Sequence, residues 1–335
     1  MTWEEIDWTA LDRLRARFLS GRTDGEPYWQ SRADLASYDF THGERIGWKW
    51  DHVLRELKLR GWRPESRAVL DWGCGSGIAA RRAIAAFGPE TFDLLTVWDH
   101  SPTACDFAAE AAQAKFPSLE VAQATRGLLD SDAPIGLLLV SHVLNELPPV
   151  ALAELRELAA RATEIIWVEP GTRDVSRQLG ALREELHATF RVVAPCTHSN
   201  ACPILAPGNE RHWCHHFAPP PPEIFADSNW VKFGQRAGID LRSLPYCFLA
   251  LDRRANLPTP LDLSRVIGRP EHFKPYARVL SCDASGLAEL ELPKRADPSL
   301  FKQLERTKAP LVYRWQRDGD KLTGGEPLVT STRET

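Results

Sequence analysis

Residues 69–77 of this 335-residue chain read Val-Leu-Asp-Trp-Gly-Cys-Gly-Ser-Gly. The apolar run that ends near Asp71 predicts a buried strand, and the apolar spacing over residues 78–87 predicts a helix directly after the glycines. Three glycines on alternate positions let the backbone turn sharply and approach a ligand without an intervening Cβ. The stretch therefore predicts a strand–loop–helix unit that binds a ligand at the carboxyl edge of a sheet.

The same alternation of strand and helix continues outward from this unit. Short apolar runs predict strands over residues 68–72, 94–98, 135–141, 164–168, 190–194 and 244–251. Amphipathic spacing predicts helices over residues 78–87, 103–114, 150–160, 175–188 and 227–237. Strands that alternate with helices form right-handed crossovers, so we expect an α/β fold with a mostly parallel, Rossmann-like sheet.

The flanking regions are organised differently from the core. Helical spacing occurs over residues 3–19 and 45–59, with a polar stretch between them that reaches Gly43. After Pro258, short apolar alternations predict a small β-rich unit, and the polar residues after Arg317 predict a flexible tail. We therefore expect an N-terminal helical region over residues 1–62 and a cofactor-binding core over residues 63–194. These are followed by a cysteine-rich insertion with return to the sheet (195–257), a β-rich unit (258–317) and a flexible tail (318–335).

The charge of the chain limits its partners. A net charge of −4 excludes a uniformly basic surface for nucleic acid. Residues 251–318 hold 13 Lys and Arg against 9 Asp and Glu, so this segment alone carries +4 and permits one basic face. No run approaches the roughly 18 apolar residues of a membrane span, and the acidic first turn resembles no targeting signal, so we expect a cytoplasmic protein with no membrane partner.

Six of the 12 tryptophans precede Arg63. Aromatic side chains at the entrance of a domain can stack on nucleobases, but burial against the neighbouring domain is their commoner use. We expect these tryptophans to be buried.

The residues around the glycine loop favour an amino-acid ligand. The helix that begins after Gly77 offers unpaired N–H groups to a carboxylate, and Asp71 can accept a hydrogen bond from an ammonium group. Ile78 stands where a dinucleotide fingerprint would place its third glycine, which argues against a pyrophosphate. Asp99 ends the second strand of the core, in a position to accept both hydroxyls of a ribose.

The pattern D-x-G-x-G-x-G, together with the second-strand acid, resembles class I methyltransferases that depend on S-adenosylmethionine (SAM). Nicotinamide binding and a purely structural turn are the alternatives to this interpretation. Cys74 is interpreted as a small packing residue. The resemblance implies cofactor contacts from Asp71, Gly73, Cys74, Gly75, Gly77, Asp99, His100, Ser101, His142 and Asn145.

The strand predicted over residues 135–141 runs into Ser-His-Val-Leu-Asn-Glu-Leu-Pro, residues 141–148, which should face the methyl donor. His142, Asn145 and Glu146 are the candidate catalytic residues, although His142 also fits a structural cap. A base is needed only if the methyl acceptor must lose a proton. The Pro-Pro-aromatic motif of amine methyltransferases is absent, and Glu169 at the end of the next strand is a further pocket candidate.

Three cysteines lie close together after the strand predicted over residues 190–194. Cys196, Cys202 and Cys214 have the spacing C-x5-C-x11-C, which differs from the C-x2-C spacing of zinc ribbons. Grouped thiolates suit a soft metal or an iron–sulfur cluster, whereas buried thiols without a metal are the simpler alternative. Cys247 lies in an apolar run typical of a core. The fourth ligand stays open among Cys282, Cys247, His198, His212, His215 and His216.

A second and more specific resemblance covers residues 45–310. The chain resembles the mitochondrial small-ribosomal-subunit methyltransferase-like family through its glycine loop, residues 142–147 and 168–172, the cysteine series in its order, and Arg265 through Asp283. The resemblance implies a 4Fe–4S cluster on Cys196, Cys202, Cys214 and Cys282, with zinc as the alternative. It also implies association with the small ribosomal subunit and its rRNA, and a monomer when off the ribosome.

Basic side chains in the C-terminal part are plausible phosphate contacts as a group: Arg265, Arg269, Lys274, Arg278, Lys294 and Arg295. Three functions follow from the sequence. The first is a methyltransferase acting on small-subunit rRNA. The second is a non-catalytic iron–sulfur assembly factor, and the third is a small-molecule methyltransferase with a structural zinc site.

Overall fold

The computed structural model describes residues 1–20, 28–254, 262–306 and 310–328. The chain folds into two compact units, each built from several segments. Unit 1 contains residues 1–55, 63–169 and 220–244, and unit 2 contains residues 56–62, 170–219 and 245–335.

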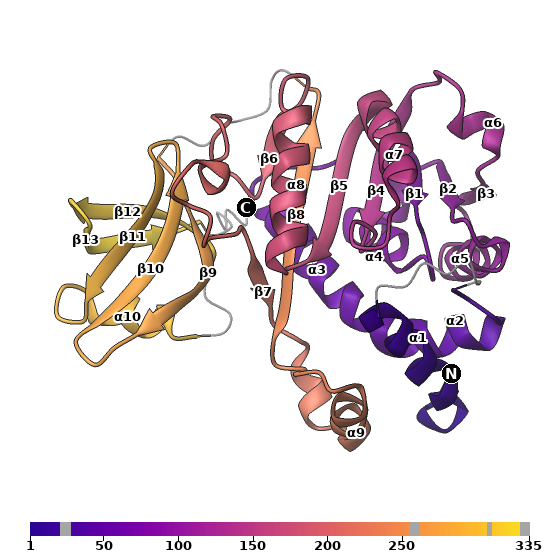
Figure 1. The fold of residues 1–335 in the computed structure, drawn as a ribbon, viewed down its shortest axis with the longest axis horizontal. Helices are drawn as coiled ribbons and strands as arrows, with labels where there is room; N and C mark the ends of the chain where they lie inside the picture. Colours follow the sequence, from indigo (N-terminus) through magenta and orange to yellow (C-terminus); the bar gives the residue numbers. More distant parts are fainter. Residues whose placement is uncertain (21–27, 255–261, 307–309, 329–335) are drawn as a thin grey trace. The chain divides into compact units, whose positions relative to one another are not determined.

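Unit 1 contains a sheet of parallel strands in the order β3-β2-β1-β4-β5 (Figure 1). The strands are β1 (Ala68–Trp72), β2 (Leu94–Trp98), β3 (Glu120–Gln123), β4 (Ile135–Ser141) and β5 (Ala162–Pro170). The connecting helices are α4 (Ile78–Phe87), η3 (Pro89–Thr91), α5 (Pro102–Lys115), α6 (Arg126–Leu129) and α7 (Pro149–Arg161). Every pair of neighbouring strands in this series is parallel. The predicted parallel α/β sheet is therefore confirmed, although β3 was not predicted.

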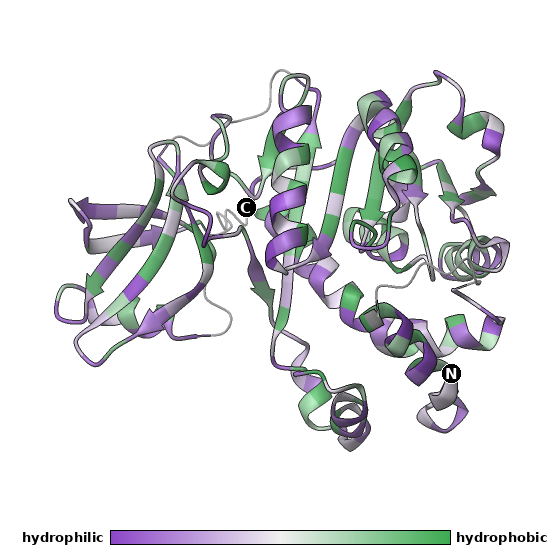
Figure 2. Cartoon of the chain, in the orientation of Figure 1, coloured by the Kyte–Doolittle hydropathy of each residue, from purple (hydrophilic) through white to green (hydrophobic). Residues whose placement is uncertain are grey.

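The middle of this sheet is buried because helices cover its faces. Leu137, Leu138, Leu139 and Val140 of β4 are each fully buried, which explains the continuous apolar run that predicted this strand. Figure 2 shows hydrophobic residues along β4 and much of β5. The carboxyl ends of β1, β2 and β4 meet at one edge, where the glycine loop lies.

The N-terminal segment of unit 1 is more helical than predicted. Its elements are η1 (Trp3–Glu5), α1 (Trp8–Ser20), α2 (Arg32–Tyr38), the π-helix η2 (Asp39–Gly43) and α3 (Glu44–Leu59). The polar stretch that reaches Gly43 is helical from Arg32 onward, within the helical region predicted for residues 1–62. The signal that was overlooked is an N-cap, since the Ser31 hydroxyl accepts from the Asp34 N–H at 3.1 Å and begins α2.

The early tryptophans are mostly buried, as predicted. Trp29, Trp48, Trp50 and Trp62 are all less than 8% exposed. Unit 1 also contains η5 (Pro222–Phe225) and α9 (Ser228–Ala237). The ring of Trp3 packs edge-on against Trp230 of α9, with centroids 5.1 Å apart, so packing accounts for the use of these aromatic residues.

Unit 2 contains three strands that pair with one another, β6, β7 and β8, and a closed barrel. Its first elements are α8 (Arg173–Leu186), β6 (Arg191–Ala194), η4 (Pro203–Leu205), β7 (His216–Ala218) and β8 (Leu244–Asp252). Strand β6 pairs antiparallel with β8, and β7 pairs with the same strand. Between β6 and β7 the chain has little regular structure, and this segment contains Cys196, Cys202 and Cys214.

The barrel confirms the predicted β-rich unit. Strands β9 (Ser264–His272), β10 (Tyr276–Asp283), β11 (Gly286–Pro293), β12 (Val312–Asp318) and β13 (Lys321–Pro327) close in the order β10-β11-β13-β12-β9. Helix α10 (Pro298–Leu304) lies between β11 and β12 in the sequence. The barrel core contains Val266, Ala277, Val279, Leu290, Leu292, Leu300, Phe301, Leu304, Tyr313 and Leu322.

The predicted flexible tail over residues 318–335 is wrong for its first part. Strand β13 pairs antiparallel with β12 and buries Leu322 completely, although its neighbours in the sequence are polar. Successive side chains of a strand point to opposite faces, and in β13 the buried face contains one large apolar residue, Leu322. A sequence pattern with so few apolar residues does not indicate a strand. Residues 329–335 lie outside the described residues. No helix among the described residues is long and apolar enough to cross a membrane.

Candidate functional site

The glycine loop between β1 and α4 requires glycine for two reasons. Gly73 and Gly77 have φ angles of +70° and +74°, which other residues adopt only with strain. A Cβ on Gly73 would lie 2.8 Å from the side chain of Val143, and a Cβ on Gly77 would lie 2.8 Å from the Cβ of Ala108. The loop is therefore packed against neighbouring elements and presents its backbone at the sheet edge.

Asp71 is a fully buried acid at this edge. Its Oδ2 accepts a hydrogen bond from the Ala80 N–H at 3.3 Å, and its Oδ1 has no hydrogen-bond partner among the described residues. Burial raises the pKa of Asp71 to about 7. A buried acceptor that lacks a donor fits the ammonium group of an amino-acid ligand, as expected from the sequence.

Asp99 links the second strand to the glycine loop. Its Oδ2 accepts from the Gly75 N–H at 3.0 Å, and its Oδ1 accepts from the Ser101 N–H at 2.9 Å. Oδ1 also lies 3.2 Å from His100 Nδ1, whereas Oδ2 keeps a second lone pair that can accept from a ribose hydroxyl. The His100 side chain is 72% exposed, and the Ser101 hydroxyl caps α5. Ser101 therefore has a structural role here.

Cys74 is buried in the same loop, in line with its interpretation as a packing residue. Its N–H donates to the Trp98 carbonyl at 2.9 Å, and its thiol lies beside Cys105. A hydrogen bond with Cys105 and burial together raise the pKa of Cys74. The thiol is therefore protonated at neutral pH and poorly nucleophilic.

His142 is engaged by neighbouring side chains. Its Nε2 lies 3.0 Å from the Lys49 ammonium group, and its Nδ1 lies 3.4 Å from the Ser141 hydroxyl. Burial and then the charges of Lys49 and Arg45 lower the pKa of His142 well below its usual value. A neutral imidazole whose Nε2 accepts from Lys49 has no lone pair left for a substrate proton. This arrangement favours the structural role of His142 over that of a base.

Glu169 holds the loop that follows β4. One of its carboxylate oxygens accepts from the N–H groups of Val143 and Leu144 at 3.1 and 3.3 Å, and from the Trp167 indole at 2.7 Å. The other oxygen has no hydrogen-bond partner among the described residues. Burial raises the pKa of Glu169 to about 7. Glu169 thus positions residues 142–147 from inside the protein.

Asn145 and Glu146 are the exposed members of this loop. The Glu146 side chain is open to solvent, yet the protein around it and the nearby Asp99 raise its pKa to about 7. An accessible carboxyl group with this pKa can exchange a proton near neutral pH. Among the three catalytic candidates, Glu146 has the environment that best suits a general base.

Two residues of this site were not predicted from the sequence. Lys49 is 8% exposed and lies in α3, where a lysine gives no signal that it is buried. Trp29 lies over the glycine loop, since a Cβ on Gly75 would be 3.9 Å from its ring. Only the enrichment of tryptophan before Arg63 pointed to this region.

The four predicted cluster ligands all lie in unit 2, and none of them forms a disulfide. Burial raises the pKa of Cys282, and the negative charges of Cys196, Cys214 and Cys202 raise it further. Burial, and then electrostatic interaction with Cys196, likewise raise the pKa values of Cys202 and Cys214. The four side chains are therefore within electrostatic reach of one another.

The side chains in this region are nevertheless farther apart than the ligands of a metal ion. Within the described parts of the chain, no three Cys, His, Asp or Glu side chains come close enough together to hold a metal ion. Histidines lie next to two of the thiols, with His198 Nε2 3.9 Å from Cys282 Sγ and His216 Nε2 3.8 Å from Cys214 Sγ. Cys247 is 2% exposed inside β8, which confirms its interpretation as a core residue.

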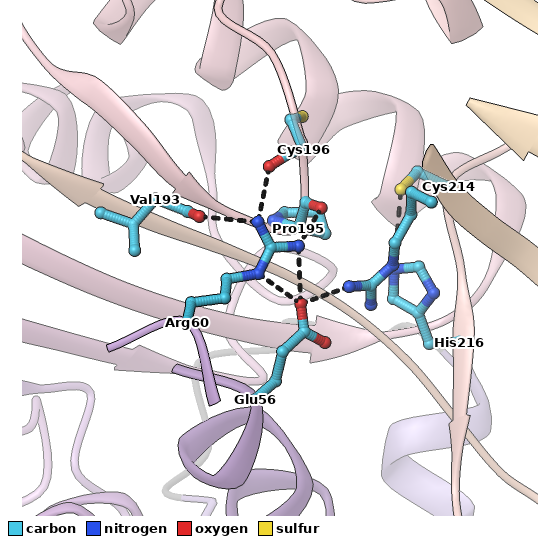
Figure 3. Close-up of polar contacts among 8 residues, drawn as sticks. Glu56, Arg60, Val193, Pro195, Cys196, Cys214 and His216 are labelled. Atoms are coloured by element: carbon cyan, nitrogen blue, oxygen red, sulfur yellow. Dashed lines mark hydrogen bonds and ion pairs between the residues drawn. The ribbon is translucent and has the colours of Figure 1, made fainter. Parts of the chain in front are cut away.

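A buried ion network supports the segment that contains Cys196 (Figure 3). Arg60 donates to the carbonyl oxygens of Val193, Pro195 and Cys196 at 3.0, 2.8 and 2.9 Å. One oxygen of Glu56 accepts from Arg60 at 3.0 Å. The same oxygen accepts from Arg265, so a single carboxylate lies between two buried guanidinium groups.

The position of Arg265 corrects one prediction. Its side chain is about 2% exposed, so it is unable to contact phosphate, whereas Arg269, Lys274, Lys294 and Arg295 are exposed. The sequence offered no signal for this difference, because side chains alternate between the two faces of a strand and Arg265 of β9 could face either side.

A third buried arginine lies beside the first two cysteines. Burial acts against the charge of Arg183, but Cys196, Glu184 and Cys202 outweigh it and raise the pKa of Arg183. Its Nε has no hydrogen-bond partner among the described residues, and the same holds for Nε and Nη2 of Arg265. Among the described residues, the ion pairs of Arg60, Arg183 and Arg265 are with Glu56 and Glu184, two carboxylates for three guanidinium groups, so the region favours a bound negative charge.

Comparisons with known proteins identify the family. The family model described as mitochondrial small ribosomal subunit Rsm22 matches residues 51–303, and the chain therefore belongs to this family. No curated protein matches the chain.

Solved structures with a similar fold include two methyltransferases. Magnesium protoporphyrin IX methyltransferase from Synechocystis PCC 6803 is 16% identical, covers 75% of this chain and 97% of its own, and has a TM-score of 0.39. The plantazolicin methyltransferase BamL is 12% identical, covers 73% of this chain and 99% of its own, and has a TM-score of 0.41. At these scores the similarities carry no functional argument.

The raised pKa of Glu169 predicts a pH dependence of stability. Between pH about 4.5 and about 7 the folded protein keeps a proton on Glu169 that the unfolded chain releases. This contribution to the free energy of unfolding is therefore complete below pH 4.5 and lost as the pH rises through 7. We expect Glu169→Gln to flatten the decline measured by urea unfolding at pH 5.0, 6.0 and 7.5. Glu157→Gln on the surface of α7 is the control, and an equal decline in both variants would contradict this prediction.

The shared carboxylate of Glu56 predicts a large effect on stability. Glu56→Gln would leave the buried charges of Arg60 and Arg265 without their common counter-ion. We expect the free energy of unfolding to fall by about 3–5 kcal/mol in denaturant titrations. The exposed pair Arg67–Asp93 is the matched control, and Asp93→Asn should cause no measurable loss. Equal stability of both variants would show that the network is unimportant.

Proposed function

We propose that this protein binds SAM and an iron–sulfur cluster and acts on the small ribosomal subunit, with rRNA as the methyl acceptor. The observation that supports the cofactor most strongly is Asp71, a buried acid with an oxygen that lacks a donor. Together with the glycine loop it would hold the amino-acid part of SAM, and Asp99 would accept from the ribose. The subunit as partner is supported by the family to which the chain belongs.

SAM supplies a methyl group on a positively charged sulfur, and the acceptor displaces S-adenosylhomocysteine. The residues of this chain would chiefly orient the reactants. Glu169 and the Lys49–His142 contact hold the loop after β4 in place. Glu146 is the side chain of this loop that would remove a proton from an acceptor that must lose one.

The cluster is proposed on Cys196, Cys202, Cys214 and Cys282. Two features support it: the mutual electrostatic effect of the four thiols, and the surplus positive charge of the buried arginines around them. A cluster held by four thiolates is anionic and would neutralise that charge. Arg60 would hold the Cys196 segment through its carbonyl oxygens, and Arg183 and Arg265 would face the thiolates.

One observation favours a second function, a non-catalytic assembly factor on the small subunit. The imidazole of His142 is already bonded to Lys49, so the residue at the expected catalytic position is committed to the structure. In that case the SAM fold would serve as a binding platform.

We expect labelled SAM to transfer its methyl group to the rRNA of small subunits purified from a strain that lacks this protein.

Asp71→Asn removes the buried charge, and SAM binding measured by calorimetry should weaken at least tenfold, because a hydrogen bond to a charged group contributes about 1.5–3 kcal/mol. Asp106→Asn, an exposed acid of α5, should bind SAM normally. Subunit binding without label would establish the assembly-factor function, and wild-type protein that fails to bind SAM would exclude the cofactor.

Anaerobically purified protein should contain about four iron atoms and four sulfides per chain and absorb visible light as clusters do. Cys282→Ser should lose most of both, whereas Cys247→Ala should keep them, since Cys247 packs in the core of β8. Circular dichroism of both variants shows whether they are folded. A stoichiometric zinc content without iron, or a folded Cys282→Ser variant with full iron content, would reject the assignment.

A further inference from the structure

The barrel of unit 2 has a recognisable topology. If β9 to β13 are numbered one to five, the strands close in the order 1-2-3-5-4, strands three and five are parallel, and the helix lies between strands three and four. This is the arrangement of the OB-fold. Barrels of this type bind oligonucleotides or oligosaccharides with strands two and three and with the loops between strands one and two and strands four and five.

An exposed aromatic pair lies at the hairpin between the first two strands, β9 and β10. The ring of Phe273 is stacked on that of Tyr276, with centroids 4.7 Å apart and planes inclined by 23°. The Phe273 N–H donates to the Tyr276 carbonyl at 2.9 Å, so the turn holds both residues in place. Phe273 is 40% exposed, so part of its ring is accessible to a ligand.

Cations surround this pair. Lys274 is exposed at the tip of the same hairpin, and the Arg278 guanidinium lies 5.4 Å from the centre of the Phe273 ring. The N–H of Lys294 donates to the Pro275 carbonyl at 2.9 Å, which brings the exposed Lys294 and Arg295 beside the tip. Lys274, Lys294 and Arg295 form no ion pair with the described residues, so their charges are available to an anion.

The adjacent surface has the opposite character. A groove of about 260 Å³ runs across the outer face of β10 and β11, and Glu289, Glu291 and Asp320 line it together with Arg278 and Lys321. Arg278 also faces Glu271 and Glu291, at 3.4 and 3.9 Å. Glu289 is also paired with Arg211, at 2.9 Å, so the carboxylates and cations of this surface largely balance. A polyanion would therefore be attracted to the hairpin tip more than to the middle of the strands.

We propose that Phe273, Lys274, Tyr276, Arg278, Lys294 and Arg295, termed the tip patch, bind single-stranded RNA. Bases stack on the two rings, and phosphates contact the lysines and Arg295, which is how proteins bind single strands without reading their sequence. This inference rests on the proposed function, because it identifies the part of the chain that contacts the RNA of the small subunit.

The test uses the full chain and a fluorescent single-stranded RNA of about 12 nucleotides, within the roughly 4–16 that one OB-fold contacts. Fluorescence anisotropy should show that Phe273→Ala weakens binding about tenfold, since stacking of a base on an aromatic ring is lost. Lys274→Gln should reduce the slope of log K against log salt by about 0.7, the value for one lost phosphate contact on a single strand. Phe225→Ala, which changes a 57% exposed ring outside the barrel, should bind like wild type.

The outcomes separate this inference from the proposed function. Wild-type protein that binds RNA equally with and without the Phe273 ring would overturn the tip patch and leave the ribosomal function standing. If isolated small subunits bind in a Phe273-dependent way while RNA oligonucleotides do not bind, the patch contacts a ribosomal protein and the inference is wrong. If neither RNA nor subunits bind, the proposed function fails together with the inference.

Discussion

Charge buried without full compensation is the constraint on which both units depend. In unit 1 the surplus is one of acceptor oxygens, since Asp71 and Glu169 each keep one buried oxygen without a donor among the described residues. In unit 2 the surplus is positive, because three buried arginines face two glutamates. A buried charge without a partner costs several kcal/mol, and a ligand of opposite charge offsets this cost. The acceptor oxygens of unit 1 suit a cationic cofactor, and the positive charge of unit 2 suits an anionic cluster.

The cysteine segment shows how such charges can order a chain that lacks regular structure. Residues 195–215 contain only one short helical turn, so many of their carbonyl groups have no partner in a helix or strand. Arg60 donates hydrogen bonds to the carbonyls of Val193, Pro195 and Cys196. Arg177 donates to the carbonyls of Ile204, Asn209 and His212. Arginine suits the task because its planar guanidinium group offers five donors in a fixed geometry.

At the edge of the parallel sheet, most polar residues position the backbone and few are available for chemistry. Glu169, Ser101 and His142 each satisfy backbone groups or neighbouring side chains. Such a site can accelerate methyl transfer by orientation, since a displacement at a sulfonium needs alignment more than proton transfer. Glu146 is the member of the loop after β4 that combines exposure with a pKa near neutrality. The proposed chemistry therefore depends on geometry first and on one carboxyl group second.

The sequence alone determined the parallel α/β sheet, the ligand loop at residues 73–77 and the core position of Cys247, because apolar periodicity and glycine spacing are local properties of the chain. It also pointed to the cysteine series, although the sequence left the fourth ligand open. Only the tertiary structure decided that Arg265 is buried against Glu56, that Lys49 contacts His142, and that residues 321–327 close a barrel. These features join residues far apart in the sequence, and whether a polar side chain faces solvent or a buried partner depends on what the rest of the chain packs beside it.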